Sequence, residues 1–232
     1  MKKFKRFIPI IIILILMIIF FIFIGFDFLS FENLKKYRNF LLSFLDKHNI
    51  LAPILFILSY IIVTALSIPG AIFLTLLGGF LFKQPFSTLY VLIGASIGAG
   101  ILFLAAKTAF RDFFQKKAGK LMKKISSEIK NHAMCYLLFL RLVPAFPFWF
   151  VNVFPAFFDI RFRTFILTTF FGIMPGTFIF TQAGAGLGSI LDSSTEFTLR
   201  SIFTFQITLV LIVFAVLSLI PVIFKKIKKK IC

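Results

Sequence analysis

One charged residue lies inside an otherwise uncharged, apolar stretch of the chain. Residues 133–158 carry Arg141, followed by Pro144, Pro147 and Asn152. An ionisable side chain at membrane depth costs roughly 3 kcal/mol on insertion scales, so such a residue usually serves a function or lines a polar cavity. A guanidinium offers paired N–H donors that match a phosphate. Arg141 is therefore a candidate phosphate ligand; the alternative is that it reaches the membrane interface or binds backbone carbonyls.

The residues after Arg141 favour a broken helix. Two prolines three residues apart interrupt helical hydrogen bonding, and the helix that starts after them has free N–H groups that attract anions. The same prolines also set the bend of the chain. Asn152 is a candidate for substrate contact, although a buried Asn also commonly binds freed backbone groups. We predict that Arg141, Pro144, Pro147 and Asn152 contribute to a substrate site.

A second broken segment lies upstream. Residues 50–82 are uncharged, too long for one membrane span and too short for two. Pro69-Gly70 and Gly78-Gly79 lie inside this run. A helix that enters, breaks and returns to the same side fits both its length and its breakers, provided that protein covers the break. Pro69 and Gly70 are assigned to the substrate site, and Gly78 and Gly79 to the shape of the hairpin.

The composition places most of the chain in lipid. Its 232 residues are 60% hydrophobic, with a mean hydropathy of +1.04, 37 Phe and only 15% charged residues. A soluble domain carries roughly a quarter charged residues, so a soluble enzyme is excluded. The net charge of +18 comes from residues that flank the apolar runs. Such residues are topology determinants, and we expect no nucleic-acid partner.

The remaining runs complete an all-α polytopic membrane protein. We expect about four full transmembrane helices (8–26, 85–106, 164–181 and 201–224), two inverted re-entrant hairpins, and amphipathic interfacial helices over 31–48 and 110–131. The predicted organisation is an anchor over 1–30, a core over 31–190 and a C-terminal helix with a basic tail over 191–232. Small or breaking residues are expected to pack helices closely or turn the chain. These are Gly94, Gly98, Gly172, Pro175 and a glycine turn that begins at Gly184.

Spacing and charge both suggest an inverted repeat. Pro69 precedes Gly98 by 29 residues, and Pro147 precedes Gly176 by the same number. With the N-terminus inside, 19 Lys and Arg residues fall inside and 6 outside, which favours cytoplasmic termini. The two hairpins then enter from opposite sides. In transporters, this layout places the substrate where two discontinuous helices meet.

The stretch FLRLVPAFPFWFVNVFPAFF, with the later FFGIMPG and GAGLG, resembles the DedA-like superfamily. It looks most like the branch called SNARE-associated Golgi or VTT-domain proteins. The matching pattern is an Arg before two prolines and an Asn, then a Gly-x-x-Pro and a terminal Gly. In this sequence those positions are Arg141, Pro144, Pro147, Asn152, Gly172, Pro175 and Gly184. The upstream IPG, LGGFLF and GASIGAG are similar to the family's first hairpin and following span.

The resemblance implies movement of lipids between leaflets, with an anionic phospholipid or polyprenyl phosphate as substrate. Several relatives carry a carboxylate in the first hairpin that is proposed to couple transport to protons. SIPGAIFLTLLGGFLF contains no acid, so coupling by that route is not expected here. The alternatives are transport of a small ion or solute through the same cavity, and a role in membrane organisation without transport.

No pattern of catalytic residues, cofactor binding or metal ligation stands out. The two cysteines lie far apart in no metal-binding pattern, and we expect neither a disulfide nor a metal site. Membrane lipids are the expected partners, self-association into a homo-oligomer is left open, and the expected location is the bacterial plasma membrane.

Overall fold

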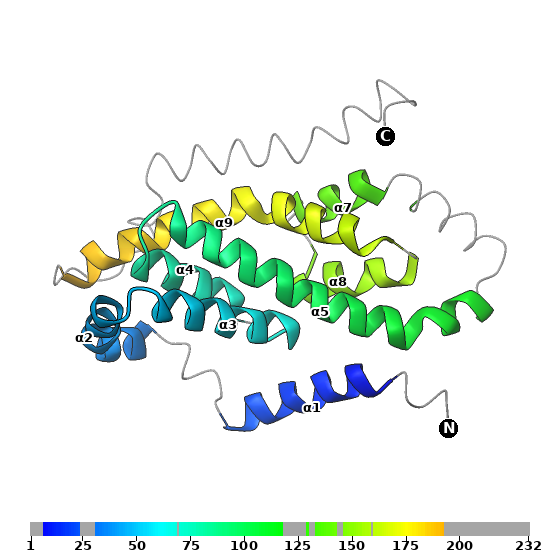
Figure 1. Ribbon diagram of the computed structural model, residues 1–232, viewed down its shortest axis with the longest axis horizontal. Coiled ribbons are helices and arrows are strands. Elements are labelled where there is room, and N and C mark those ends of the chain that lie inside the picture. The colour runs from blue at the N-terminus through cyan, green and yellow to red at the C-terminus, as the bar shows by residue number, and fades with distance from the viewer. Residues whose placement is uncertain are drawn as a thin grey trace, which may run out of the picture.

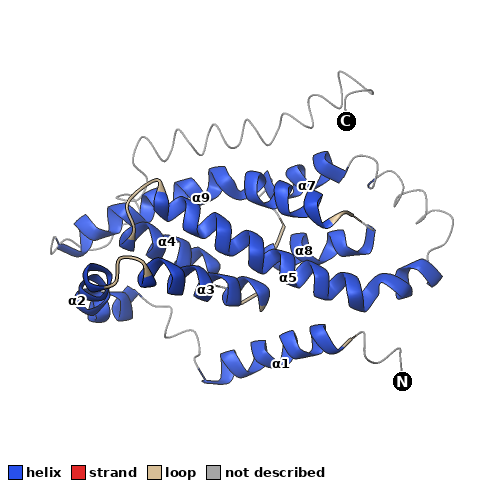
Figure 2. Ribbon diagram, viewed as in Figure 1, coloured by secondary structure: helices blue, strands red, loops and turns tan. Residues whose placement is uncertain are grey.

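The computed structural model describes residues 7–23, 31–68, 70–117, 129, 133–142, 146–158 and 160–192. Every regular element among them is a helix, as Figure 2 shows. Two of these helices are long and apolar enough to cross a membrane, Phe86–Ala109 and Phe162–Gly186. The expected all-α class is confirmed. The predicted last span over 201–224 lies outside the described residues.

The first helix is shorter than the span predicted over 8–26, and the second has the expected composition. α1 (Ile8–Phe23) consists almost entirely of apolar residues and is 16 residues long. α2 (Phe31–Lys47) mixes apolar and charged residues, as expected of an amphipathic helix. In Figure 1, α1 lies along the outside of the bundle, and α2 lies at one end and runs across it.

The first broken segment forms a helix, a break and a second helix. α3 (Leu51–Ala65) ends in two bonds of the Schellman type, Ser67 N–H to Thr64 O and Ile68 N–H to Val63 O. Ser67 takes the left-handed position of this motif, with φ 53°, where a glycine is usual. α4 (Ala71–Leu81) then begins at Gly70, whose φ of 150° suits only glycine. Pro69 lies outside the described residues.

α5 corrects one predicted boundary. We expected a span over 85–106 and a separate amphipathic helix over 110–131, but α5 runs from Phe86 to Lys117 without interruption. The residues between the two predicted elements, Lys107 to Ala109, include no glycine or proline. A change from apolar to charged composition does not by itself end a helix, because Lys and Arg are good helix formers.

The second broken segment is also a helix, a break and a helix. α7 (Ala133–Leu142) precedes the break, and α8 (Phe148–Val153) with the 3₁₀ helix η3 (Phe154–Phe158) follows it. Pro147 is the N-cap of α8, and Pro144 lies outside the described residues. In Figure 1 the α3–α4 pair opens toward the end where α2 lies, and the α7–α8 pair opens toward the opposite end.

α9 (Phe162–Asp192) is longer than predicted. The glycine turn expected at Gly184 is wrong, because the helix continues through it. The predicted span over 164–181 lies wholly within α9, and Pro175 lies inside this helix, as it does in the predicted span. Gly184 is used for packing: a side chain there would collide with the backbone carbonyl of Leu76 in α4.

Other glycines also bring helices into backbone contact. A Cβ at Gly79 of α4 would overlap the carbonyl oxygen of Thr181 in α9. A Cβ at Gly98 of α5 would lie 2.6 Å from the Ile61 oxygen of α3, and one at Gly94 would lie 2.8 Å from the Tyr60 Cβ. Gly78, by contrast, faces the end of the Phe56 side chain. Helices in lipid gain stability from close packing, and small residues permit it.

Two large buried apolar clusters, one around each hairpin, form most of the core of the described residues, and a small third cluster joins Ile179 and Ala183 of α9 to Leu76 of α4. The first joins α3 and α4 to the N-terminal part of α5, with Tyr60 and Val91 among its most buried residues. The second joins α7 and η3 to the middle of α5 and the start of α9, around Phe103 and Phe165. Beside the second cluster, Cys135 of α7 is disulfide-bonded, so the expectation of unbridged cysteines is wrong. Distance along the chain does not prevent such a bond, because folding brings remote segments together.

The contact between α4 and α9 yields a first prediction. Gly79→Ala should lower the free energy of unfolding by about 1–3 kcal/mol, because the added methyl group must push two backbones apart. Gly186→Ala is the matched control in α9. A Cβ there meets nothing within 4 Å, so it should be neutral or stabilising by about 0.5–1 kcal/mol. Thermal unfolding in detergent measures both, and equal unfolding temperatures for Gly79→Ala and wild type would contradict the packing.

Candidate functional site

Arg141 is buried at the end of α7, next to the break of the second hairpin. Its side chain is only 8% exposed, and its Nη2 donates a hydrogen bond of 2.8 Å to Thr169 Oγ1 in α9. The Cζ atom lies 5.2 Å from the ring centroid of Phe165 and 5.9 Å from that of Phe148. Among the described residues, Nη1 has no hydrogen-bond partner. Of the two terminal nitrogens of the guanidinium, Nη2 is thus hydrogen-bonded and Nη1 is unpaired in the described structure.

Gly172 explains how α9 reaches Arg141. A Cβ at this position would lie 2.7 Å from the Cβ of Arg141, so any larger residue would push α9 away from α7. Phe165, Thr169 and Gly172 fall at i, i+4 and i+7, which places them along one face of α9. This face packs against the end of α7. Toward Arg141 it places the ring of Phe165, the hydroxyl of Thr169 and, at Gly172, a position without a side chain.

The charge of Arg141 is not neutralised by a carboxylate among the described residues. It interacts instead with one hydroxyl group and two aromatic rings. A buried cation is costly unless it is paired and hydrogen-bonded. An arrangement with one unpaired nitrogen therefore favours binding of an anion at that nitrogen.

Asn152 is the second buried polar group of this hairpin. It lies in α8 and is 0% exposed, and neither its Oδ1 nor its Nδ2 has a partner among the described residues. Leaving a buried polar group unsatisfied typically costs about 1–3 kcal/mol. No hydrogen bond joins Asn152 to Arg141, so two separate polar groups of one hairpin have unused hydrogen-bonding capacity.

The first hairpin carries hydroxyl groups rather than charge near its break. Thr64, at the end of α3, is 1% exposed, and its Oγ1 has no partner among the described residues. Thr75, Thr168 and Thr169 instead donate to carbonyls one turn earlier in their own helices. The Ser67 hydroxyl is likewise buried and unpartnered in the described structure.

The predicted site residues fall into two groups in the structure. Arg141 and Gly172 are in contact, and Asn152 belongs to the same hairpin as Arg141. Gly70 lies in the other hairpin, at the N-cap of α4. Pro175 lies within α9, three residues beyond Gly172. Pro69 and Pro144 lie outside the described residues.

Sequence reasoning missed the residues that surround the guanidinium. These are Thr169, Phe165 and Phe148. The helical stripe that includes Gly172 was a usable signal for Thr169 and Phe165, because a packing glycine marks the face that approaches another helix. Phe148 had no such signal among 37 phenylalanines.

Comparison with known proteins gives a family match and several relatives. Residues 68–186, which include both α4 and most of α9, match the VTT domain. Transmembrane protein 41B of Xenopus tropicalis is 32% identical over 176 residues, covering 74% of this chain and 61% of the relative. Transmembrane protein 41B of Homo sapiens is 30% identical over 177 residues, covering 74% of this chain and 58% of the relative.

A third relative extends the match. The transmembrane protein 41 homolog of Dictyostelium discoideum is 30% identical over 200 residues, covering 85% of this chain and 58% of the relative. The chain thus spans about three fifths of the length of these relatives. These relatives are eukaryotic, so they do not support the expected bacterial membrane. No solved structure matches the chain at a significant level. The matched domain and these identities establish that this chain is a membrane protein of the VTT-domain family, within the DedA superfamily.

Proposed function

We propose that the chain moves lipids with an anionic phosphate headgroup between the two leaflets of a membrane. The observation that carries the proposal is the buried Arg141 guanidinium, fixed through Nη2 to Thr169 while Nη1 has no partner among the described residues. A phosphate oxygen is a suitable acceptor for such an N–H group, and charge-assisted hydrogen bonds are the strong ones. The proposed role is transport, without covalent chemistry.

The arrangement of the hairpins supports a path between leaflets. The α3–α4 and α7–α8 pairs open toward opposite ends of the bundle (Figure 1). In the proposed topology both are re-entrant, and four other segments, including α5 and α9, span the membrane. The breaks of the two hairpins then lie within the membrane, where non-helical backbone needs protein or a polar cavity around it.

The proposed path gives the two hairpins different roles. The second hairpin binds phosphate through Arg141, with Asn152 as an additional donor to the headgroup. The first hairpin offers only neutral hydroxyl groups near its break, from Thr64 and Ser67. It carries no carboxylate, so the proposed movement does not depend on a proton-accepting acid at that place.

Orientation remains a prediction from charge. The excess of basic residues near α5's C-terminal end and at both ends of the chain supports cytoplasmic termini. The expected bacterial plasma membrane is likewise a prediction.

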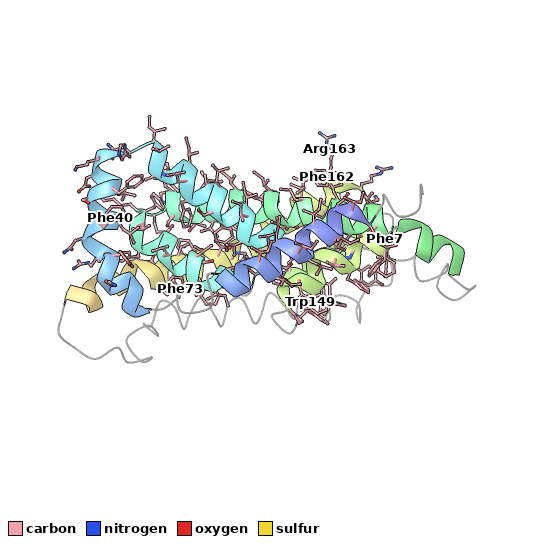
Figure 3. The ribbon with its side chains drawn as sticks, turned by 90° about the horizontal axis from the view of Figure 1, so that it is seen from below. Phe7, Phe40, Phe73, Trp149, Phe162 and Arg163 are labelled. Atoms are coloured by element: carbon pink, nitrogen blue, oxygen red, sulfur yellow. The ribbon has the colours of Figure 1, made fainter. Side chains whose placement is uncertain are left out.

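Reconstitution in liposomes tests the proposal. The full chain should move fluorescent anionic phospholipid between leaflets faster than protein-free liposomes do. Arg141→Gln should slow this movement by at least about tenfold, because a lost charged hydrogen bond is worth about 1.5–3 kcal/mol. Arg163→Gln is the matched control, because Arg163 is exposed and points away from the bundle (Figure 3), and it should move lipid at the wild-type rate.

Several outcomes would contradict the proposal. Wild-type rates equal to those of protein-free liposomes would exclude lipid movement. Uptake of a small solute without lipid movement would favour solute transport, and neither activity would favour a role in membrane organisation. A folded Arg141→Gln protein with unchanged lipid movement would remove Arg141 from the mechanism.

Asn152 gives a prediction in which stability and function separate. Asn152→Leu replaces an unpartnered buried amide with an apolar side chain of similar size. It should raise the free energy of unfolding by about 1–3 kcal/mol, because the desolvation cost of the amide disappears. Lipid movement should fall at the same time. Thermal unfolding and the liposome assay measure the two effects, and a lower unfolding temperature would show that the amide is hydrogen-bonded in the folded protein.

A further inference from the structure

A stacked pair of phenylalanines lies between two cations in the second hydrophobic cluster. The rings of Phe103 in α5 and Phe165 in α9 are 4.3 Å apart between centroids and 16° from parallel. Both side chains are fully buried. Arg141 Cζ lies over Phe165 at 5.2 Å, and Lys107 Nζ lies over Phe103 at 5.7 Å. Each ring therefore has one face toward the other ring and one face toward a cation.

The stack fixes the position of Phe165. A Cβ at Gly100 of α5 would lie 2.8 Å from Ile166 Cδ1 and 3.2 Å from the Phe162 ring, so the absence of a side chain there brings α5 and α9 together. Parallel rings of this kind add about 0.5–1.5 kcal/mol beyond their buried area. Phe165 thus has little freedom to tilt, and neither has the guanidinium that lies on its other face.

Lys107 of α5 fixes the position of the beginning of α9 relative to α5. It is four residues after Phe103 in α5, on the same face of the helix. Its Nζ donates a hydrogen bond of 2.7 Å to the carbonyl of Ile160, two residues before the start of α9. This bond ties the residue that precedes α9 to the helix that carries Phe103.

We propose that Phe165, held by Phe103 and Lys107, is a positioning residue that sets the plane of the Arg141 guanidinium and directs Nη1 toward the lipid phosphate. The inference rests on the proposed function and extends it. Two contacts define the orientation of the planar Arg141 guanidinium. One is the hydrogen bond from Nη2 to the Thr169 hydroxyl, and the other is the Phe165 ring, whose centroid lies 5.2 Å from Cζ. The Phe165 ring also covers the buried guanidinium of Arg141, which has little contact with water. A cation–π interaction becomes stronger when the cation is desolvated.

Phe148 does not take this role. It lies 5.9 Å from Cζ, but it belongs to the first turn of the short helix α8, directly after the break. Phe165 lies in the first turns of the 31-residue helix α9 and is packed on α5. The ring on the longer, better anchored helix is the one that defines the geometry of the arginine.

Fluorinated phenylalanines test the proposal, because fluorine removes electron density from the ring face with little change in size. One, two or three fluorines at position 165 should weaken binding of dihexanoyl phosphatidic acid to the detergent-solubilised full chain in graded steps. Phe165→Leu should weaken binding by roughly fivefold to thirtyfold. Isothermal calorimetry measures the affinity, and thermal unfolding measures the stability of each variant.

Phe158 is the matched control for a role in packing alone. It is buried in the same cluster and its ring contacts Phe154, with no cation over it in the described structure. Phe158→Leu and the same fluorine series at position 158 should lower stability as much as at position 165, or more, while the affinity stays within about twofold of wild type.

The outcomes separate this inference from the proposed function. A wild-type protein that binds the probe, with an affinity that is flat across the fluorine series at position 165, overturns the inference alone. A wild-type protein that neither binds the probe nor moves lipid overturns the proposed function, and the inference with it. An equal loss of affinity at positions 158 and 165 assigns both rings to packing and also overturns the inference.

Discussion

The structure depends on covering interrupted backbone. Each hairpin ends one helix and begins another in the interior of the bundle, and free N–H and C=O groups in an apolar environment are costly. The first hairpin satisfies part of this demand itself, through the two terminal bonds that Ser67 and Ile68 donate. The rest is covered by the long helices, α5 and α9, which lie against both hairpins (Figure 1).

Covering the broken backbone requires the long helices to pack closely against the hairpins. Glycines at the contact points make this close packing possible. α9 touches the backbone of α4 at Gly79 and Gly184 and the base of the Arg141 side chain at Gly172. These three positions keep a long helix near two broken ones. The buried arginine and its aromatic stack are therefore consequences of the same packing that keeps the hairpins covered. A shift of α9 would move Thr169 and Phe165 together, since both lie on that helix.

The broken segments could be predicted from the sequence because length and breakers act locally. An uncharged run that fits neither one span nor two must bend, and Pro69-Gly70 gives the place. The predicted end of the span at residue 106 was wrong, because a change to charged residues does not end a helix. The predicted turn at Gly184 was wrong for another reason: a glycine can end a helix or allow close packing of a neighbouring helix, and the two uses look alike in a sequence. Which use applies at Gly184 depends on α4, more than a hundred residues away.

The candidate site was predictable in the same partial way. A lone arginine in an apolar run is visible in the sequence, whereas its surroundings depend on the packing of α7 against α9. Thr169 looks like any other helical threonine, and Phe165 like any of 37 phenylalanines. Only the contact at Gly172 distinguishes them.

Pro175 divides α9 between the two hairpins. On its N-terminal side, Gly172 meets α7, and on its C-terminal side Thr181 and Gly184 meet α4. A proline removes one helical hydrogen bond, so bending at this point costs less than elsewhere in the helix. Each hairpin is thus joined to its own half of α9. A bend of α9 at Pro175 would change the angle between the two hairpins while the glycine contacts of each half stay intact.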